Sequence, residues 1–451
     1  MKYSKFNLLV EGKDNKKILF NTMSGNNFVI SDDLCDALKS GNVDVLDEDI
    51  RKAFIEKGII IDDKIDENKY FAYYHNKTKF DNSSVGSTIL LTWACNFACV
   101  YCFEGAGEKV LTLTKENADK YVKFMKNQAK GRKASSMNIT LFGGEPLVNI
   151  KMGFEILDEL HSFCDEESIE FSCGIITNGT LLTDEVLDKL KAHNCNMIQI
   201  TLDGMKEVHD GRRPYKGGRG SFDDVIAAIK KVNDKEGVHG VIRINVDKTN
   251  IDEAFKLLKY LGKDGENLTN CTVDFGIVRG STMACSAYAG NCFVEEEIGE
   301  ILDVLWAEAE KNGFIENTTP MRRWMYCGLY SDSQFTVTPD AAVYKCWEHA
   351  GMDEHKMGEL DENGNFVNPQ FAYFDWMSAT PTENEDCAAC VYLPVCGGGC
   401  GVVSYNETQS YHSKGCFKVR GVVEKQVERY VNKKLEHKCA ECSAQCEAKD
   451  A

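Results

Sequence analysis

The bulk properties of the chain exclude several classes of protein. Its 451 residues exceed a single ordinary core, so two to four domains are expected. An apolar fraction of 43% and a charged fraction of 27% are typical of a globular protein. The net charge of −18 disfavours a general partner of nucleic acid or of an anionic membrane. Because no apolar run reaches the roughly 20 residues of a membrane span and no signal peptide is recognisable, a cytoplasmic location is expected.

The number of cysteines is unusual for such a chain. There are 20, and in a reducing cytoplasm they are not expected to form a disulfide framework. Metal binding or catalysis is therefore the leading explanation. Four of them are interpreted as small buried apolar residues without chemistry, namely Cys35, Cys164, Cys173 and Cys195.

Residues 1–85 predict a small separate unit. The expected order is strands at 6–10, 18–21 and 28–30, helices at 32–38 and 48–56, and a strand at 59–61. Ser31 is a plausible N-cap for the first helix, and Asp47 begins the second. Three strands followed by helices suggest a winged-helix arrangement, and the polar stretch 62–84 is interpreted as a linker.

Strands and helices alternate between residues 86 and 315. Strands are expected at 88–92, 138–142, 170–176, 197–202, 241–246 and 273–278. Helices are expected at 115–128, 152–164, 183–193, 222–233, 252–261 and 294–311. Six such units predict an α/β fold with a parallel sheet, either open or a partial barrel, and functional groups at the carboxyl ends of its strands.

Two motifs follow the first two of these strands. Cys95, Cys99 and Cys102 have the spacing C-x-x-x-C-x-x-C, and three thiolates on a cluster of four irons leave one iron open to an outside ligand. A structural zinc site is the alternative, but it needs four ligands and no fourth lies nearby. In the second motif, at residues 143–146, paired glycines let the backbone approach a ligand, and Glu145 can accept a hydrogen bond from an ammonium group.

Cysteines become dense after about residue 314. Five stand within thirty residues, Cys387, Cys390, Cys396, Cys400 and Cys416, and two more lie upstream, Cys327 and Cys346. Two neighbouring metal centres are the natural interpretation, because a zinc ribbon needs only four ligands.

The end of the chain, residues 421–451, is expected to hold a C-terminal helix and a cysteine-containing tail. The helix is expected over 418–435, with Val419, Val423, Val427, Tyr430 and Val431 on one face. The tail carries Cys439, Cys442 and Cys446, and is interpreted as disordered or adventitiously metal-binding.

The cysteine triad and the Gly-Gly-Glu-Pro loop resemble the radical S-adenosylmethionine (SAM) superfamily over about residues 87–311. The resemblance implies a partial (β/α)6 barrel and a 4Fe–4S cluster on Cys95, Cys99 and Cys102, with SAM chelated to the open iron. The implied cofactor-binding residues are Gly143, Gly144, Glu145, Pro146, Thr201 and Arg213. For the last two, a strand-end hydroxyl and a surface salt bridge are the alternatives.

The later cysteines resemble the SPASM domain, expected over residues 316–420. The resemblance implies a distal auxiliary 4Fe–4S cluster on Cys387, Cys390, Cys396 and Cys416. It implies a proximal one on Cys327, Cys346 and Cys400. A glycine of the family is replaced near Ala341, and Ser333 stands where sulfatase maturases have a further cysteine. The proximal cluster is therefore expected to have three protein ligands, unless Cys285 or Cys292 completes it.

Together these resemblances imply a radical SAM enzyme with three 4Fe–4S clusters that modifies a peptide. An open proximal iron favours capture of a substrate thiolate and a thioether crosslink, as in sactipeptide and ranthipeptide maturases. Formylglycine formation and carbon–carbon crosslinking are the enzymatic alternatives. A non-enzymatic iron–sulfur carrier is the third, but it has no use for the open three-cysteine site.

The expected partners follow from this function. The substrate is a ribosomally made precursor peptide with a leader and a cysteine-containing core, and the reductant is a low-potential donor such as flavodoxin or ferredoxin. The N-terminal unit resembles, in architecture, the precursor-recognition elements that add a leader as a strand to a sheet edge. A DNA-binding winged helix is the alternative, but the Asp and Glu of this region would repel phosphates. No nucleic acid or membrane partner is expected.

Overall fold

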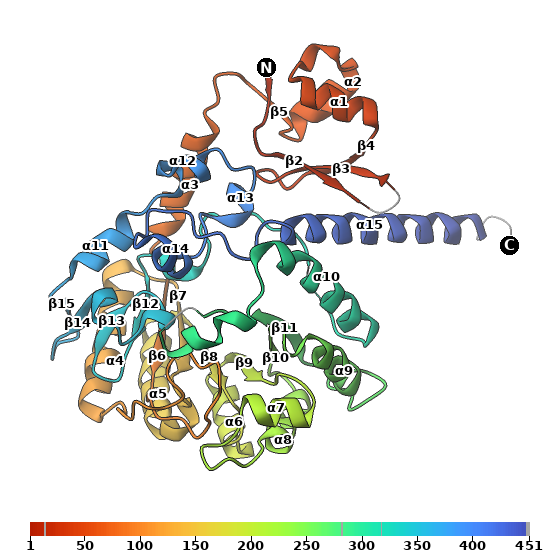
Figure 1. Ribbon diagram of the computed structural model, residues 1–451. Coiled ribbons are helices and arrows are strands. Elements are labelled where there is room, and N and C mark those ends of the chain that lie inside the picture. Colours follow the sequence, from red (N-terminus) through yellow and green to blue (C-terminus); the bar gives the residue numbers. More distant parts are fainter. Residues whose placement is uncertain (13–14, 281–282, 317, 448–451) are drawn as a thin grey trace.

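The computed structural model describes residues 1–12, 15–280, 283–316 and 318–447, without the side chains of 283–285 and 437–447. Figure 1 shows a small N-terminal unit, a larger α/β body, and the long helix α15 (Val422–Glu447) running between them. None of the described helices combines the length and apolarity needed to span a bilayer.

The N-terminal unit contains two small antiparallel sheets and two helices. One sheet pairs β1 (Lys2–Tyr3) with β5 (Ile60–Ile61), and the other is formed by β2 (Asn7–Glu11), β3 (Lys17–Asn21) and β4 (Asn27–Ile30). The helices are α1 (Asp32–Ser40) and α2 (Glu48–Glu56). Ser31 caps α1 by accepting a hydrogen bond from the Leu34 amide, as predicted, whereas Asp47 makes no side-chain cap.

The interpretation of residues 62–84 as a linker is wrong. They contain helix α3 (Glu67–Lys79), whose Phe71, His75 and Lys79 are buried. His75 Nδ1 lies 2.7 Å from the carbonyl oxygen of Trp324, and Lys79 Nζ donates to Ala379 O at 2.8 Å. The helix is polar on average, so only its tertiary contacts reveal that it fastens the N-terminal unit to the C-terminal region.

Six parallel strands form the centre of the body in chain order, which confirms the predicted α/β class. They are β6 (Ser84–Leu90), β7 (Ser136–Phe142), β8 (Glu170–Thr177), β9 (Cys195–Thr201), β10 (Gly240–Val246) and β11 (Thr272–Ile277). The helices are α4 (Lys115–Arg132), α5 (Ile150–Glu167), α6 (Asp184–Ala192), α7 (Lys206–Arg212), α8 (Phe222–Asn233), α9 (Ile251–Leu261) and α10 (Glu295–Lys311). Helix α7 was not predicted. Cys164, Cys173 and Cys195 lie in this core and Cys35 in that of the N-terminal unit, as expected.

The sheet continues into the cysteine-rich region, which the sequence did not predict. Strand β12 (Gln334–Val337) pairs in parallel with β6, and β13 (Ala342–Tyr344), β14 (Gly358–Leu360) and β15 (Phe366–Val367) follow in antiparallel order. The short helices after them are α11 (Phe371–Ser378), α12 (Glu385–Ala388), α13 (Leu393–Cys396) and α14 (Gly401–Thr408). A single sheet of ten strands therefore crosses the expected boundary at 315, with β11 at its opposite end.

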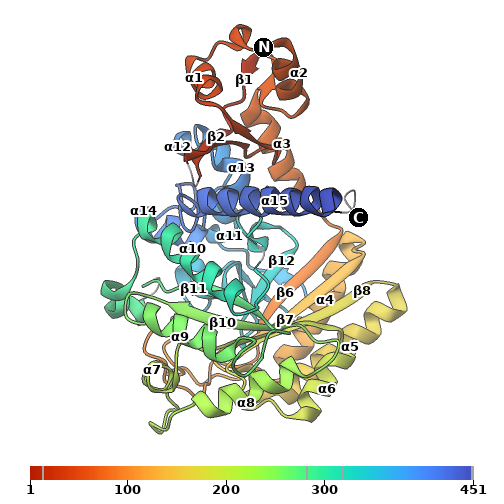
Figure 2. The same cartoon turned by 90° about the vertical axis from the view of Figure 1, so that its right-hand side faces the viewer.

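Helix α15 separates the N-terminal unit from the body (Figure 2). It begins later than predicted, because Lys418 (φ 56°) and Gly421 (φ 74°) have left-handed backbones. The predicted apolar face is confirmed, since Val423, Val427 and Val431 pack with Leu8 and Phe20 of the N-terminal sheet. The expectation of a disordered tail is wrong for the backbone, because the helix continues to Glu447 through Cys439, Cys442 and Cys446. Their side chains lie outside the described part of the chain.

Candidate active site

A cavity of about 560 Å³ opens at the carboxyl ends of the parallel strands. Seven predicted site residues line it: Cys95, Cys99, Cys102, Gly143, Gly144, Thr201 and Arg213. Its far wall comes from the end of β11 and the cysteine-rich region, including Arg279, Glu348 and Phe417. The fold thus brings together motifs that are more than a hundred residues apart.

The cysteine loop is held in place by the chain after α7. The amides of Ala98 and Val100 donate to Pro214 O at 2.8 Å and to Arg212 O at 3.1 Å. Burial raises the pKa of Cys95 to about 12 and that of Cys102 to about 11, and the charge of Cys99 adds to both shifts. The three sulfurs are therefore close enough to repel one another as thiolates, and a cation is needed to keep them ionised together.

The paired glycines are required by a close crossing of two loops. A Cβ at Gly143, whose φ is 131°, would overlap Thr92 O, and one at Gly144 would overlap Trp93 O. The amides of Gly144 and Glu145 donate to Thr92 O and Ala94 O, each at 2.9 Å. The Gly-Gly pair thus fixes the second motif directly against the cysteine loop.

Glu145 and Pro146 lie behind the cavity wall. Glu145 Oε1 accepts from Thr177 Oγ1 (2.6 Å) and the Leu147 amide (2.9 Å), and Oε2 accepts from the Asn178 amide (2.7 Å). Burial raises the pKa of this fully buried carboxyl group. Three protein donors leave one lone pair of Oε2 for a ligand, so the predicted contact with an ammonium group stays a prediction.

Replacing Glu145 by glutamine should weaken SAM binding. The neutral amide group of glutamine replaces the charged acceptor that the ammonium group of SAM is predicted to contact, and the loss of such a charge-assisted hydrogen bond costs about 1–3 kcal/mol of binding free energy. We expect SAM affinity, measured by anaerobic calorimetry, to fall by roughly 5- to 100-fold. The control is Glu155→Gln on α5, whose side chain is 52% exposed. Equal affinity in both variants would contradict the role of Glu145.

Arg213 is buried, so the alternative of a surface salt bridge is wrong. Its Nη1 donates to Tyr101 Oη at 2.8 Å, and Tyr101 Oη in turn donates to Asp203. Asn245 also donates to Tyr101 Oη, at 3.2 Å. Sequence reasoning gave Tyr101, Asp203 and Asn245 no role, although Tyr101 stands inside the cysteine motif and Asp203 two residues after Thr201. Thr201 is buried at the end of β9, which is consistent both with a contact to the cofactor and with a strand-end hydroxyl group.

The four cysteines predicted for the distal cluster line one small cavity. Lys414 and Arg420 also line it, so cationic groups surround these thiols. Positive φ angles at residues 397–399 turn the chain, and the Cys400 amide donates to Gly415 O at 2.8 Å. The predicted role of the glycine run is thus consistent with its geometry.

The three cysteines predicted for the proximal cluster also converge. The pKa of Cys346 is raised by burial first and then by the charges of Glu348, Cys400 and Cys327. Arg279 connects this set with the main cavity, because Nη1 donates to Cys400 Sγ at 3.7 Å and Nη2 to Glu348 at 2.6 Å. Since Arg279 and Glu348 line the main cavity, the proximal set borders it.

Ser333 and Cys292 belong to other hydrogen-bond groups. Ser333 Oγ lies 3.0 Å from Ser331 Oγ, just before β12. Cys292 Sγ lies 3.9 Å from the carbonyl oxygen of Tyr288, whose hydroxyl donates to Asp247 at 2.9 Å. The side chain of Cys285 lies outside the described part of the chain. Among the described side chains, the cysteines that act on the pKa of Cys346 are Cys327 and Cys400, and three protein ligands for the proximal cluster stay a prediction.

Comparison with known proteins now identifies the class. The chain matches the radical SAM superfamily over residues 89–261. The mycofactocin maturase MftC of Mycolicibacterium smegmatis is 26% identical over 69% of this chain and 76% of its own. A cysteine-type anaerobic sulfatase-maturating enzyme of Clostridium perfringens is 24% identical over 68% of this chain and 85% of its own. This chain is a radical SAM enzyme, a class that uses SAM and 4Fe–4S clusters. Within it, the chain is related to the SPASM-type peptide maturases.

The likeness to a solved structure extends further along the chain. Streptococcus suis SuiB bound to its precursor peptide SuiA has a TM-score of 0.53 and 16% identity, covering 93% of this chain and 100% of that one. The remaining 7% of 451 residues is about 32 residues, fewer than the 79 residues up to the end of α3. The shared fold therefore reaches into the N-terminal unit.

Proposed function

We propose that the enzyme forms a thioether crosslink between a cysteine sulfur and a carbon of a ribosomally made precursor peptide. The observation that carries this proposal is the convergence of Cys327, Cys346 and Cys400 behind Arg279 and Glu348, two residues that line the main cavity. Three protein thiolates leave one iron of a 4Fe–4S cluster available to a fourth, external thiolate. A substrate cysteine in the cavity would be held there next to the carbon that reacts.

The residues present fit three 4Fe–4S clusters. Each predicted set has its sulfurs close together at a half-buried site, and the four distal ones share one cavity. Within the described side chains, no three His, Cys, Asp or Glu groups are arranged to hold a single metal ion. A four-iron cluster requires a wider arrangement of ligands than a single ion, because each thiolate binds its own iron at a corner of the cube. Bound SAM supplies the radical that removes a hydrogen atom from an unactivated carbon.

The protein's own residues position the substrate and exclude water. Arg279 lies half-buried between Cys400 and the cavity, where its charge stabilises a neighbouring thiolate. Arg213 lies beside Cys99 on the opposite wall and is held by Tyr101. Formation of a thioether removes two hydrogens from the peptide: the carbon would lose a hydrogen atom to the radical derived from SAM, and the sulfur a proton. The remaining electron would pass to an iron–sulfur cluster. The cavity must therefore keep both groups oriented until the new bond closes.

Formylglycine formation is the second candidate, because one relative is a cysteine-type sulfatase-maturating enzyme. The three-cysteine proximal set favours the thioether. Carbon–carbon crosslinking is a third option, and it requires no external thiolate.

Co-expression with each short cysteine-containing reading frame that sequencing finds beside the gene tests the function. Mass spectrometry of the thioether product should show a loss of two hydrogens and one cysteine that no longer reacts with iodoacetamide. A carbon–carbon crosslink loses two hydrogens but leaves every cysteine reactive. Formylglycine formation removes the sulfur and creates an aldehyde that reacts with hydrazide. Either of the last two results would overturn the thioether assignment.

The N-terminal unit is proposed to capture the precursor at a sheet edge. Strand β4 is an outer strand of its sheet, and Val29 on it is 48% exposed. Deletion of residues 1–84 would remove the buried helix α3, so a point substitution is the better test. We expect Val29→Glu to weaken precursor binding at least tenfold in fluorescence anisotropy while SAM cleavage stays normal. Val45→Glu, at a 59% exposed position of the same unit, is the control, and equal binding by both would argue against capture at β4.

A further inference from the structure

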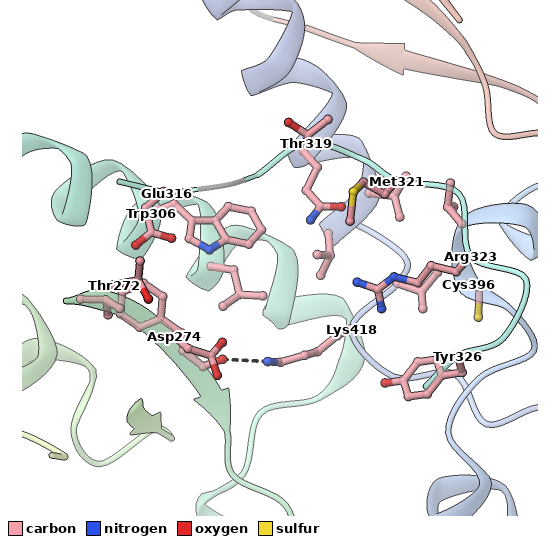
Figure 3. Close-up of a pocket in the computed structure, with 18 of the residues that line it drawn as sticks. Thr272, Asp274, Trp306, Glu316, Thr319, Met321, Arg323, Tyr326, Cys396 and Lys418 are labelled. Atoms are coloured by element: carbon pink, nitrogen blue, oxygen red, sulfur yellow. Dashed lines mark hydrogen bonds between the residues drawn. The ribbon is translucent and has the colours of Figure 1, made fainter. Parts of the chain in front are cut away.

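A second cavity, of about 440 Å³, lies at the outer edge of the parallel sheet (Figure 3). It is enclosed by β11, α10, residues 315–316 and 319–326, residues 395–396, and residues 418–426 at the start of α15. In Figure 3, Trp306 of α10, Glu316 and Met321 of the segment after it, and Lys418 surround the space. Ile315 and Met321 are 79% and 59% exposed, so one side of this groove presents apolar side chains to solvent.

The strand that lines this groove has an unpaired outer edge. β11 is the last strand of the sheet and pairs only with β10 in the described chain. The Val278 amide donates inward to Val246 O at 3.0 Å, whereas Phe275 O faces outward and accepts from Lys418 Nζ at 2.7 Å. Because backbone groups alternate along a strand, Val273 also directs its N–H and C=O outward. The groove thus offers a template for another strand.

The groove leads into the main cavity along β11. Residues 272–275 line the groove, residues 277–279 line the main cavity, and Lys418 lines both. The backbone at Lys418 is fixed, because Glu295 accepts from the amides of Lys418 and Val419, each at 3.1 Å. Val419 and Val423 line the groove and pack with the N-terminal sheet, so the groove lies directly below the unit proposed to capture the precursor.

The charges at the junction favour an acidic partner. Arg243 pairs with Asp274, and Arg279 pairs with Glu348. The ammonium group of half-buried Lys418 has three protons, and its described hydrogen bond, to Phe275 O, uses one. A carboxylate that enters between groove and cavity would meet the other two.

We propose that the precursor peptide reaches the active site as an extended strand along the outer edge of β11, with an acidic side chain beside Lys418. This inference rests on the proposed peptide-modifying function. At about 3.3 Å per residue, residues 272–279 span roughly 26 Å, so about eight peptide residues lie between the groove entrance and the reacting cysteine. Main-chain hydrogen bonds would supply affinity, and Lys418 would set the register.

Two variants of the holoenzyme test the path. Val273→Pro removes an outward N–H without removing a bond to β10, and Val273→Ala controls for lost packing. Gln426→Trp fills the groove from α15, and Lys434→Trp, at an exposed position of the same helix, is its control. The probes are synthetic peptides that carry one cysteine and at least one Asp or Glu, taken from any short reading frame that sequencing finds beside the gene. Both test variants should lose at least tenfold in peptide affinity and in peptide modification, with normal SAM cleavage without peptide.

Hydrogen exchange separates this inference from the proposed function. A bound probe should protect the outward-facing amides of Val273, Phe275 and Ile277 in the wild-type enzyme. Changing an Asp or Glu of the probe to the corresponding amide should weaken its binding to the wild type tenfold, but not its binding to Lys418→Gln. Protection without any modification would contradict the proposed function and leave the path supported. Two results would overturn the path. One is modification of the probe by the wild type without such protection, and the other is modification of the probe at normal rates by both test variants. An affinity that stays the same when the acidic side chain of the probe is replaced would overturn the role of Lys418.

Discussion

Replacing Cys95, Cys99 and Cys102 together by alanine is expected to abolish SAM cleavage while about two-thirds of the iron remains. The three sulfurs lie together at the main cavity, next to the loop that Gly143 and Gly144 press against them. Since their cluster holds the iron that SAM is proposed to chelate, its loss removes the reaction altogether. The distal and proximal sets lie on other elements, so their clusters should assemble without it. The measurements are 5′-deoxyadenosine formation under dithionite and iron per chain.

Cys164→Ala provides the control for this experiment. Cys164 is fully buried in the core of the α/β body, and its sulfur contacts Met137 rather than a predicted cluster ligand. This variant should keep all its iron and its SAM cleavage, with only a modest loss of stability. Unchanged iron in the triple variant would remove the triad from the list of cluster ligands.

Binding of a precursor cysteine should change the spectrum of the proximal cluster. Its predicted protein ligands are Cys327, Cys346 and Cys400, and a thiolate is a far better ligand for the remaining iron than water or a hydroxyl group. We expect a new electron paramagnetic resonance signal when the wild-type enzyme binds its precursor. Cys346→Ala should lose this signal, about one-third of the iron and all crosslinking, yet still cleave SAM without peptide.

A precursor with serine in place of the reacting cysteine is the matched control, because it binds the same surfaces without a thiolate. It should leave the spectrum unchanged. The opposing outcome is a cluster with four protein thiolates. In that case Cys285→Ser or Cys292→Ser would change the spectrum of the enzyme alone, and thiolate capture would lose its basis.

Local sequence signals predicted many elements because their causes lie within a few residues. The cap at Ser31 and the bounds of α2 and α8 were read correctly from side chains next to them in the chain. The positions of α3, β12 and Arg213 were not. Each is stabilised by distant partners: α3 by the region of Trp324, β12 by β6, and Arg213 by Tyr101.

The sequence by itself determined the class of the enzyme, because the spacing of Cys95, Cys99 and Cys102 and the Gly143–Gly144 pair are local requirements of one chemistry. It also determined the alternation of strands and helices, which follows from periodic burial along short segments. Only the tertiary structure decided that Arg279 joins the proximal set to the main cavity and that Lys418 stands between two cavities. No local pattern marks either residue. Their environments are created when β11, the cysteine-rich region and α15 pack together and bury charges that the sequence places far apart.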